Sequence, residues 1–311
     1  MAHANAPGYP LTAGTRDLRE ACAGWLTRRQ GVTVEESAVL PAIGTKEFVA
    51  ALPLLLSLDA RSHIVIPRTA YPTYAVGAGV VGARITATDA PEDIPDADLI
   101  WLNSPSNPTG RVLPVERMRS IVAHARATGA VVASDECYIE LGWEARPVSV
   151  LHPDVVGASH ERVLALHSLS KRSNFAGYRS GFVAGDPALV ATMLVIRKHL
   201  GMMTPLPVQH AAVAAWSDDA HVDVQRARYA ARREILRNTL LSTGFAIDDS
   251  EAGLYLWATR GEPCWQSVAW FAERGILVTP GEFYGVAGAH HVRIALTATD
   301  RDITAVADRL L

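Results

Sequence analysis

Short apolar segments alternate with helical stretches over the first two thirds of the chain, and this alternation constrains the fold more than any other feature. Apolar, β-rich runs that predict strands lie at 63–67, 83–88, 97–103, 130–135, 162–168 and 181–185. Helical patterns lie between them at 45–57, 72–81 and 114–128. Strands joined through helices pair in parallel, with crossovers that place helices on both faces of the sheet. The sequence therefore predicts an α/β fold whose large domain has three layers, α/β/α, around a mostly parallel sheet.

The pattern changes after about residue 190. Long helical stretches come first, at 189–201, 207–217 and 219–241. Strand-like segments follow at 254–259, 276–280 and 291–296. We therefore predict a large domain over 9–200, then a connecting long helix and a small C-terminal α+β domain over 201–311.

Composition excludes several classes of protein. The formal net charge of −3 offers no electrostatic attraction to nucleic acid or to an anionic membrane. No apolar run approaches the roughly 18 residues that span a bilayer. The three cysteines have neither metal-ligand spacing nor a disulfide framework, so we expect no metal site and a reducing, cytoplasmic location.

One glycine motif matches a dinucleotide-binding pattern but stands in the wrong context. Gly77, Gly79 and Gly82 have the spacing GxGxxG. In a dinucleotide site these glycines follow a strand and open a helix, so that the pyrophosphate meets free backbone N–H groups. Here they end a helical stretch and precede a strand. We interpret them as a helix terminus, which argues against a nicotinamide enzyme.

Polar clusters follow three of the predicted strands, at 104–110, 134–138 and 168–171. Each motif alone is ordinary: the first is a good turn sequence, and an aspartate after a strand can cap a helix or bind a metal. Ligands of open α/β sheets bind at the carboxyl ends of the strands. The three clusters therefore predict one site at that edge of the sheet.

The residue types in these clusters suit an aromatic aldehyde that carries a phosphate and a pyridine nitrogen. A lysine amine can attack the aldehyde, and only three of the 29 basic residues are lysines, Lys171 among them. The Asp135 carboxylate would keep a ring nitrogen protonated, which makes the ring an electron sink. A phenol and an amide can bond a ring oxygen, and hydroxyls with an arginine can bind a phosphate.

With these motifs the chain resembles the fold-type I pyridoxal-phosphate (PLP) aminotransferases, the aspartate aminotransferase superfamily, over essentially its whole length. The resemblance is carried by SNPTG at 106–110, SDECY at 134–138 and SLSKRSNFAGYRSG at 168–181. It implies that Lys171 carries pyridoxal 5′-phosphate covalently and that Asp135 pairs with its ring nitrogen. The remaining roles that it implies are ring-oxygen contacts for Asn107 and Tyr138, with Tyr138 also catalytic, and phosphate contacts for Ser168 and Arg179.

The resemblance extends to residues outside the three clusters. Thr45 and Lys46 match a phosphate-binding turn at a helix start, and Tyr71 matches the aromatic residue that stacks on the cofactor ring. Arg293 matches the arginine that, beside Asn107, binds the substrate α-carboxylate. Tyr9 matches a tyrosine that reaches the phosphate of the neighbouring subunit. The family therefore implies a homodimer with shared active sites, acting on small amino-acid and 2-oxo-acid substrates.

Within the superfamily, the stretch HSLSKRSNFAGYRSGFVAGD at 167–186 is most similar to N-succinyldiaminopimelate aminotransferases. This implies amino transfer between glutamate, with 2-oxoglutarate as its product, and N-succinyl-2-amino-6-oxopimelate, a step of lysine and diaminopimelate biosynthesis. Such a substrate carries several carboxylates, and Arg172 is a candidate to bind the distal ones.

Other functions remain open at this stage. Another class I/II amino-acid aminotransferase or a PLP carbon–sulfur lyase would keep the cofactor residues and change the substrate contacts. The family's N-terminal arm, some tens of residues before the GYP segment, is missing from the sequence. A truncated PLP-binding protein without efficient turnover is therefore a further alternative.

Overall fold

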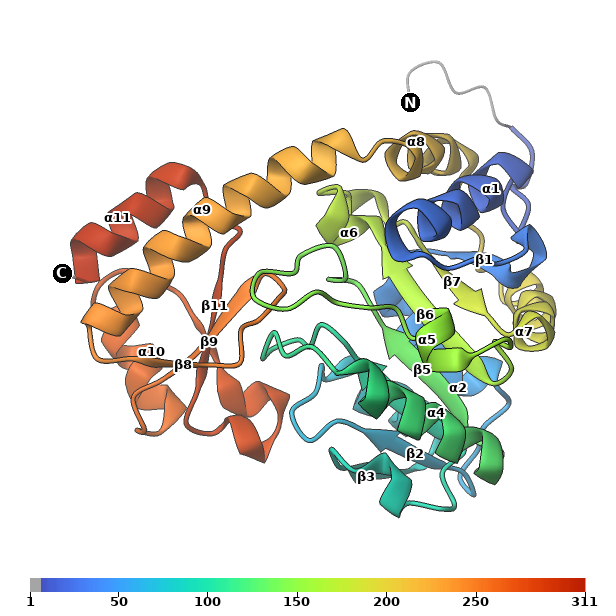
Figure 1. The fold of residues 1–311 in the computed structure, drawn as a ribbon, viewed down its shortest axis with the longest axis horizontal. Coiled ribbons are helices and arrows are strands. Elements are labelled where there is room, and N and C mark those ends of the chain that lie inside the picture. The colour runs from blue at the N-terminus through green and yellow to red at the C-terminus, as the bar shows by residue number, and fades with distance from the viewer. Residues whose placement is uncertain (1–6, 311) are drawn as a thin grey trace.

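The computed structural model describes residues 7–310, which form two β-sheets surrounded by helices (Figure 1). The larger sheet has seven strands in the order β1-β7-β6-β5-β4-β2-β3. Its strands are β1 (Val39–Ala42), β2 (His63–Ile66), β3 (Arg84–Ala87), β4 (Leu99–Asn103), β5 (Val131–Asp135), β6 (Val163–Ser168) and β7 (Gly181–Gly185). Strands β2 to β6 pair in parallel, and β7 and β1 are added antiparallel at one edge. The predicted mostly parallel α/β sheet is confirmed.

Helices cover both faces of this sheet, as three layers require. In the fully buried strand β4, Ile100 and Leu102 face one apolar core while Leu99 and Trp101 face the other, because successive side chains of a strand point to opposite faces. The first core is completed by α1 (Arg16–Trp25), α4 (Val115–Thr128), α5 (Pro153–Val156) and α8 (Leu206–Ser217). The second is completed by α2 (Thr45–Leu55), α3 (Thr73–Val81) and α7 (Pro187–His199).

The long helix α9 (Ala220–Ser242) runs from α8 to the smaller sheet (Figure 1). That sheet is antiparallel, with the order β10-β11-β9-β8. Its elements are β8 (Ala246–Asp248), β9 (Tyr255–Thr259), β10 (Thr279–Pro280) and β11 (Val292–Ala295), with α10 (Cys264–Ala272) and α11 (Asp300–Leu310) beside them. The predicted small α+β part is confirmed, whereas the division of the chain at residue 200 stays a prediction.

One of the predicted strands differs from expectation. The apolar run 276–280 forms a strand only at Thr279–Pro280, and Leu277 is 97% exposed. Strand β3 lies at the edge of the large sheet and is largely exposed. The glycine motif behaves as predicted: Gly82 ends α3 with a φ of 71°, directly before β3. Strand β1 was not predicted from the sequence, because it is short, contains Pro41 and pairs only with β7.

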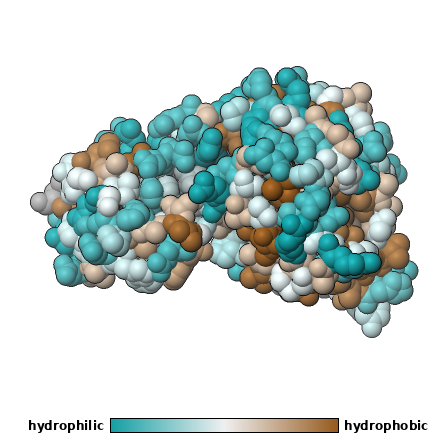
Figure 2. Space-filling view, turned by 90° about the horizontal axis from the view of Figure 1, so that it is seen from below, coloured by the Kyte–Doolittle hydropathy of each residue, from teal (hydrophilic) through white to brown (hydrophobic). Residues whose placement is uncertain are grey.

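Hydrophilic and apolar residues are interspersed over the face of the molecule seen in Figure 2. Among the helices of residues 7–310, none combines the length and the apolarity needed to cross a membrane.

The loop between β8 and β9, residues 249–253, fastens the small sheet to the large one, and we call it the junction loop. Its Ser250 and Ala252 N–H groups donate to the carbonyls of Thr109 and Gly110, at 2.8 and 2.9 Å. Its Gly253 N–H donates to Leu141 O, at 2.8 Å. The junction loop therefore binds both chain segments that leave β4 and β5, the two central strands.

Candidate active site

A cavity of about 420 Å³ opens at the carboxyl ends of β4, β5 and β6, within the range typical of ligand pockets. Ten of the eleven site residues predicted from the sequence line it. They are Thr45, Lys46, Tyr71, Asn107, Asp135, Tyr138, Ser168, Lys171, Arg179 and Arg293. Their convergence from six separate parts of the chain is what the topology of an open α/β sheet predicts.

Tyr9 is the predicted residue that lies outside this cavity. It is 96% exposed on the segment that precedes α1. Its predicted contact is with the phosphate of a neighbouring subunit, so its role stays a prediction.

Asp135 ends β5 as a buried carboxylate at the base of the cavity. Its Oδ2 accepts the Tyr74 hydroxyl at 3.1 Å, and its Oδ1 accepts the Cys137 N–H at 3.2 Å. Burial raises the pKa of Asp135 above its usual range, although these two hydrogen bonds oppose the rise. Within residues 7–310 no cation lies at ion-pair distance from it. A buried carboxylate with no cation beside it is suited to pairing with a protonated ring nitrogen.

A group of residues suited to binding an anion lines the cavity where α2 begins. Arg179 has a left-handed φ of 57°, and its guanidinium donates to the carbonyls of Ala176 (2.9 Å) and Ile43 (3.4 Å). A Cβ at Gly44 would lie 2.3 Å from Arg179 Nη2, so only glycine allows this approach. Helix α2 starts at Thr45 without a side-chain cap. The backbone N–H groups at the start of α2 lie beside the Arg179 guanidinium, which the two carbonyls hold in place. Such a combination of donors is suited to binding a phosphate.

Asn107 and Arg293 lie in contact in the lining of the cavity. Arg293 Nη1 donates to Asn107 Oδ1 at 2.9 Å, and Arg293 Nε is buried without a hydrogen-bond partner among residues 7–310. Asn103, at the end of β4, holds the loop in place: its Oδ1 accepts the Asn107 N–H (2.7 Å) and its Nδ2 donates to Asp135 O (2.9 Å). Arg293 lines the cavity, and a guanidinium there is suited to binding a carboxylate.

Lys171 lies on the single-turn helix α6 (Leu169–Arg172), directly after β6. The Ser168 hydroxyl caps this turn by accepting the Ser170 N–H at 3.1 Å. This cap fixes the start of the turn, and Lys171 lines the cavity together with Asp135.

Arg172 does not face the cavity, so the suggestion that it binds distal carboxylates of a substrate is wrong. It is 4% exposed and forms ion pairs with Glu140 (2.5 Å) and Asp219 (2.6 Å). Its guanidinium lies against the rings of Trp25 and Trp216. Neighbouring residues of a helix point about 100° apart, so the residue after Lys171 points into the core beside α1 and α8.

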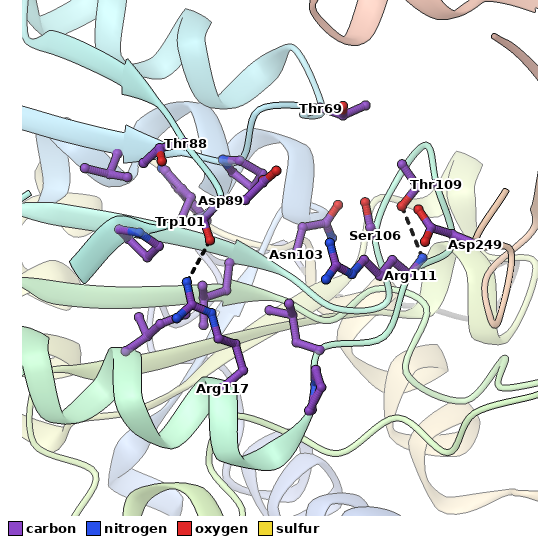
Figure 3. A pocket seen from close by; sticks show the side chains of 17 residues that line it. Thr69, Thr88, Asp89, Trp101, Asn103, Ser106, Thr109, Arg111, Arg117 and Asp249 are labelled. Carbon is purple, nitrogen blue, oxygen red and sulfur yellow. Dashed lines mark hydrogen bonds between the residues drawn. The ribbon is translucent and has the colours of Figure 1, made fainter. Parts of the chain in front are cut away.

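A second cavity, of about 340 Å³, lies beside α4 and shares the loop after β4 (Figure 3). None of the predicted site residues lines it. Arg117 on α4 donates to Asp89 O at 2.7 Å, and the Arg111 and Asn103 side chains point toward one another (Figure 3). This cavity lacks the lysine and the buried carboxylate that the predicted chemistry needs.

The sequence motifs missed several residues of the site. Tyr74 lies on the first turn of α3 and donates to Asp135. It follows Tyr71 by three residues, a spacing that places side chains on one face of a helical turn and could have identified it. Cys137 lies within the SDECY motif and lines the cavity. Tyr255 also lines it, and an aromatic residue in a strand gives no signal that separates a site from a core.

Comparison with known proteins identifies the class. The family model for aminotransferases of class I and II matches residues 2–310. A probable aminotransferase of Mycobacterium tuberculosis is 58% identical over 98% of this chain and 74% of the relative. The 4-dedimethylamino-4-oxo-anhydrotetracycline transaminase OxyQ of Streptomyces rimosus is 57% identical over 98% of this chain and 86% of its own.

Solved structures agree with these relatives. The N-succinyldiaminopimelate aminotransferase of Mycobacterium tuberculosis superimposes with a TM-score of 0.90 at 27% identity, over 98% of this chain and 85% of that one. The probable N-succinyldiaminopimelate aminotransferase of Thermus thermophilus gives 0.89 at 28% identity, over 98% and 87%.

The chain belongs to the class I and II aminotransferases, and the predicted resemblance is confirmed. Its cofactor is pyridoxal 5′-phosphate, on which members of this family depend. The unpaired buried carboxylate of Asp135 and the glycine cradle beside Arg179 both fit that molecule.

Proposed function

We propose that this aminotransferase takes an amino group from glutamate and transfers it to N-succinyl-2-amino-6-oxopimelate. The observation that carries the proposal is the single cavity in which Lys171, Asp135 and Arg179 converge with Arg293. The first three suit the cofactor, and Arg293 supplies a guanidinium for the α-carboxylate that both substrates share.

Each residue of the site has a proposed task. The bound cofactor supplies an electron sink next to the substrate α-carbon. Lys171 Nζ holds the cofactor and, once released, moves the α-proton. Asp135 keeps the ring nitrogen charged, and Arg179 with the start of α2 binds the phosphate. Arg293 orients the substrate through its carboxylate, because a planar guanidinium fixes two oxygens at once.

The acceptor is proposed from two features. The stretch that carries Lys171 is most similar to N-succinyldiaminopimelate aminotransferases, and structures of that name superimpose closely. In addition, the cavity contains Lys46, whose Nζ lies 5.9 Å from the centre of the Tyr71 ring. A cation besides Arg293 suits a substrate that has further carboxylates.

A second acceptor class is favoured by one observation. OxyQ, named as an oxo-anhydrotetracycline transaminase, is 57% identical, well above the 27% of the N-succinyldiaminopimelate aminotransferase structure from Mycobacterium tuberculosis. A polycyclic ketone is therefore the alternative acceptor.

Two half-reactions test the proposal. Purified holo-protein is mixed with glutamate, and the change in cofactor absorbance is followed, with Lys171→Ala as the inactive control. The aminated protein is then offered N-succinyl-2-amino-6-oxopimelate, 2-oxoglutarate or the tetracycline ketone. Fast return of the original spectrum with the succinylated substrate supports the proposal. Return with the ketone alone would replace the acceptor, and no reaction with glutamate would remove the donor.

We also propose that the enzyme acts as a cytoplasmic homodimer with shared active sites. The exposure of Tyr9, which has no role in its own subunit's cavity, supports the shared sites. Absorbance of PLP bound to a mixture of Tyr9→Phe and Lys171→Ala subunits tests this, because only a shared site makes the two defects complement each other.

A further inference from the structure

Tyr255 lies between the substrate end and the cofactor end of the cavity. It begins β9, is 8% exposed and lines the cavity. Across the strand pair it lies opposite Ala295, while Trp257 lies opposite Arg293. Because alternate residues share a face of a sheet, Tyr255 and Arg293 are diagonal neighbours on the cavity face.

The ring of Tyr255 supports the guanidinium of Arg293. The distance from Arg293 Cζ to the centre of the Tyr255 ring is 3.9 Å, and that to the Tyr284 ring is 5.1 Å. The Asn107 side chain holds the same guanidinium from another direction, at 2.9 Å. A guanidinium over the face of an aromatic ring is attracted to it by a cation–π interaction. The guanidinium is thus held in position by the Tyr255 ring and the Asn107 side chain together.

The hydroxyl of Tyr255 contacts the other end of the site. It lies 3.1 Å from the hydroxyl of Tyr138, and the two rings meet edge to face with centroids 5.8 Å apart. Both phenols are buried, and burial raises the pKa of Tyr138 well above its usual range. Tyr138 therefore keeps its single proton. It can direct that proton at a cofactor oxygen only when it accepts, rather than donates, in its bond with Tyr255.

We propose, on the basis of the transaminase function above, that Tyr255 is a positioning residue for both ends of the reaction. Its ring orients Arg293 toward the substrate carboxylate. Its hydroxyl donates to Tyr138 Oη, so that the Tyr138 proton points at the cofactor ring oxygen. Tyr255 thereby links substrate orientation to the protonation state of the cofactor.

The hydroxyl is tested with Tyr255→Phe in the PLP-bound protein. A donor to Tyr138 makes that phenol a stronger donor in turn, which favours the deprotonated ring oxygen of the cofactor. Loss of the donor should therefore raise the pH midpoint of the cofactor absorbance change by at least about 0.5 pH unit. The matched control is Tyr284→Phe, which removes a phenol from the other aromatic neighbour of Arg293 and should leave the midpoint unchanged.

The ring is tested by comparing Tyr255→Phe with Tyr255→Leu in the glutamate half-reaction. Phenylalanine keeps the ring under Arg293, so the apparent dissociation constant for glutamate should stay within about twofold of wild type. Leucine removes the ring, and the constant should rise by about tenfold. If the leucine variant does not fold, as judged by circular dichroism, Tyr255→Met replaces it.

The outcomes separate this inference from the proposed function. An unshifted midpoint in Tyr255→Phe, in a protein that binds PLP, overturns the hydroxyl role alone. Equal glutamate affinity in the phenylalanine and leucine variants overturns the ring role alone. A wild-type protein that binds no PLP overturns the proposed function and the inference together. A wild-type protein that binds PLP but does not react with glutamate overturns only the proposed donor, and the absorbance measurement still tests the role of the Tyr255 hydroxyl.

Discussion

Replacement of Glu136 by glutamine should change how the stability of the protein depends on pH. Glu136 follows Asp135 at the end of β5 and is 1% exposed. Its Oε1 accepts the Val150 N–H at 2.6 Å, while its Oε2 lies 3.6 Å from His167 Nε2. Burial raises the pKa of Glu136 to about 7 and lowers the pKa of His167 to about 3. The pair is therefore largely uncharged in the folded protein between about pH 4 and pH 6.

The sign of the effect follows from linkage between protonation and folding. The folded state binds a proton at Glu136 up to about pH 7, whereas an unfolded glutamate, with the model value 4.5, releases it earlier. The stabilising contribution of Glu136 is therefore fully present below about pH 4.5 and is lost as the pH rises from there to about 7. Between pH 5 and pH 8 the loss is about 2–3 kcal/mol, at 1.36 kcal/mol per pH unit. The lowered pKa of His167 makes the protein less stable as the pH falls below 6.5. This effect is present in both the wild type and Glu136→Gln, so it cancels in the difference between their free energies of unfolding.

Equilibrium urea unfolding of the wild type and Glu136→Gln at pH 5, 6, 7 and 8 measures this difference. Glutamine cannot ionise, and its carbonyl can still accept the Val150 N–H, so the variant should gain about 2–3 kcal/mol relative to wild type from pH 5 to pH 8. The matched control is Glu234→Gln on the exposed face of α9, for which the difference should stay flat. Parallel pH profiles for wild type and Glu136→Gln would refute the reasoning.

Four further predictions concern the site and its support. The purified protein should be yellow, and borohydride reduction should fix the cofactor on the peptide containing Lys171; label on either of the other two lysines would end that assignment. Asp135→Ala should bind PLP weakly and lose most transamination, because the electron sink is lost, and near-normal turnover would mean that the ring is misplaced. Arg293→Lys should lower kcat/KM by at least about 100-fold, or roughly 2.7 kcal/mol, with glutamate and with the succinylated substrate alike, while the PLP absorbance stays unchanged. A loss with only one substrate would instead place this arginine at a distal carboxylate. Gly110→Ala should lower the melting temperature, because Gly110 has a φ of 74° and an added Cβ would lie 2.5 Å from Ala252 O; an unchanged melting temperature would contradict this.

The central strands and the site motifs were readable from the sequence for related physical reasons. Strands β4, β5 and β6 are buried on both faces and therefore appear as continuous apolar runs. Polar clusters placed directly after three such runs are ordinary one by one, but together they predict a shared site at one edge of the sheet. This is why the positions of Asn107, Asp135 and Lys171 at one edge of the sheet could be predicted.

Features that depend on tertiary contacts could not be predicted from the sequence. Leu277 belongs to an apolar run that resembles a buried strand, yet only the last two residues of the run find a partner. Arg172 is adjacent to Lys171, but the turn of α6 points it into the core, a direction that spacing alone does not reveal. The contact of Tyr255 with Tyr138 joins residues 117 positions apart, and no local pattern encodes it.

The junction loop has a consequence for how heat unfolds the protein. A C-terminal part joined only through α9 could melt independently and give two calorimetric transitions. Here the loop's backbone bonds run to Thr109, Gly110 and Leu141, on the segments that follow the two central strands. If the small sheet separated, the carbonyls of these three residues, next to the middle of the large sheet, would lose their hydrogen-bond donors. The two sheets should therefore form one cooperative unit, with a calorimetric enthalpy equal to the van't Hoff enthalpy in a single endotherm.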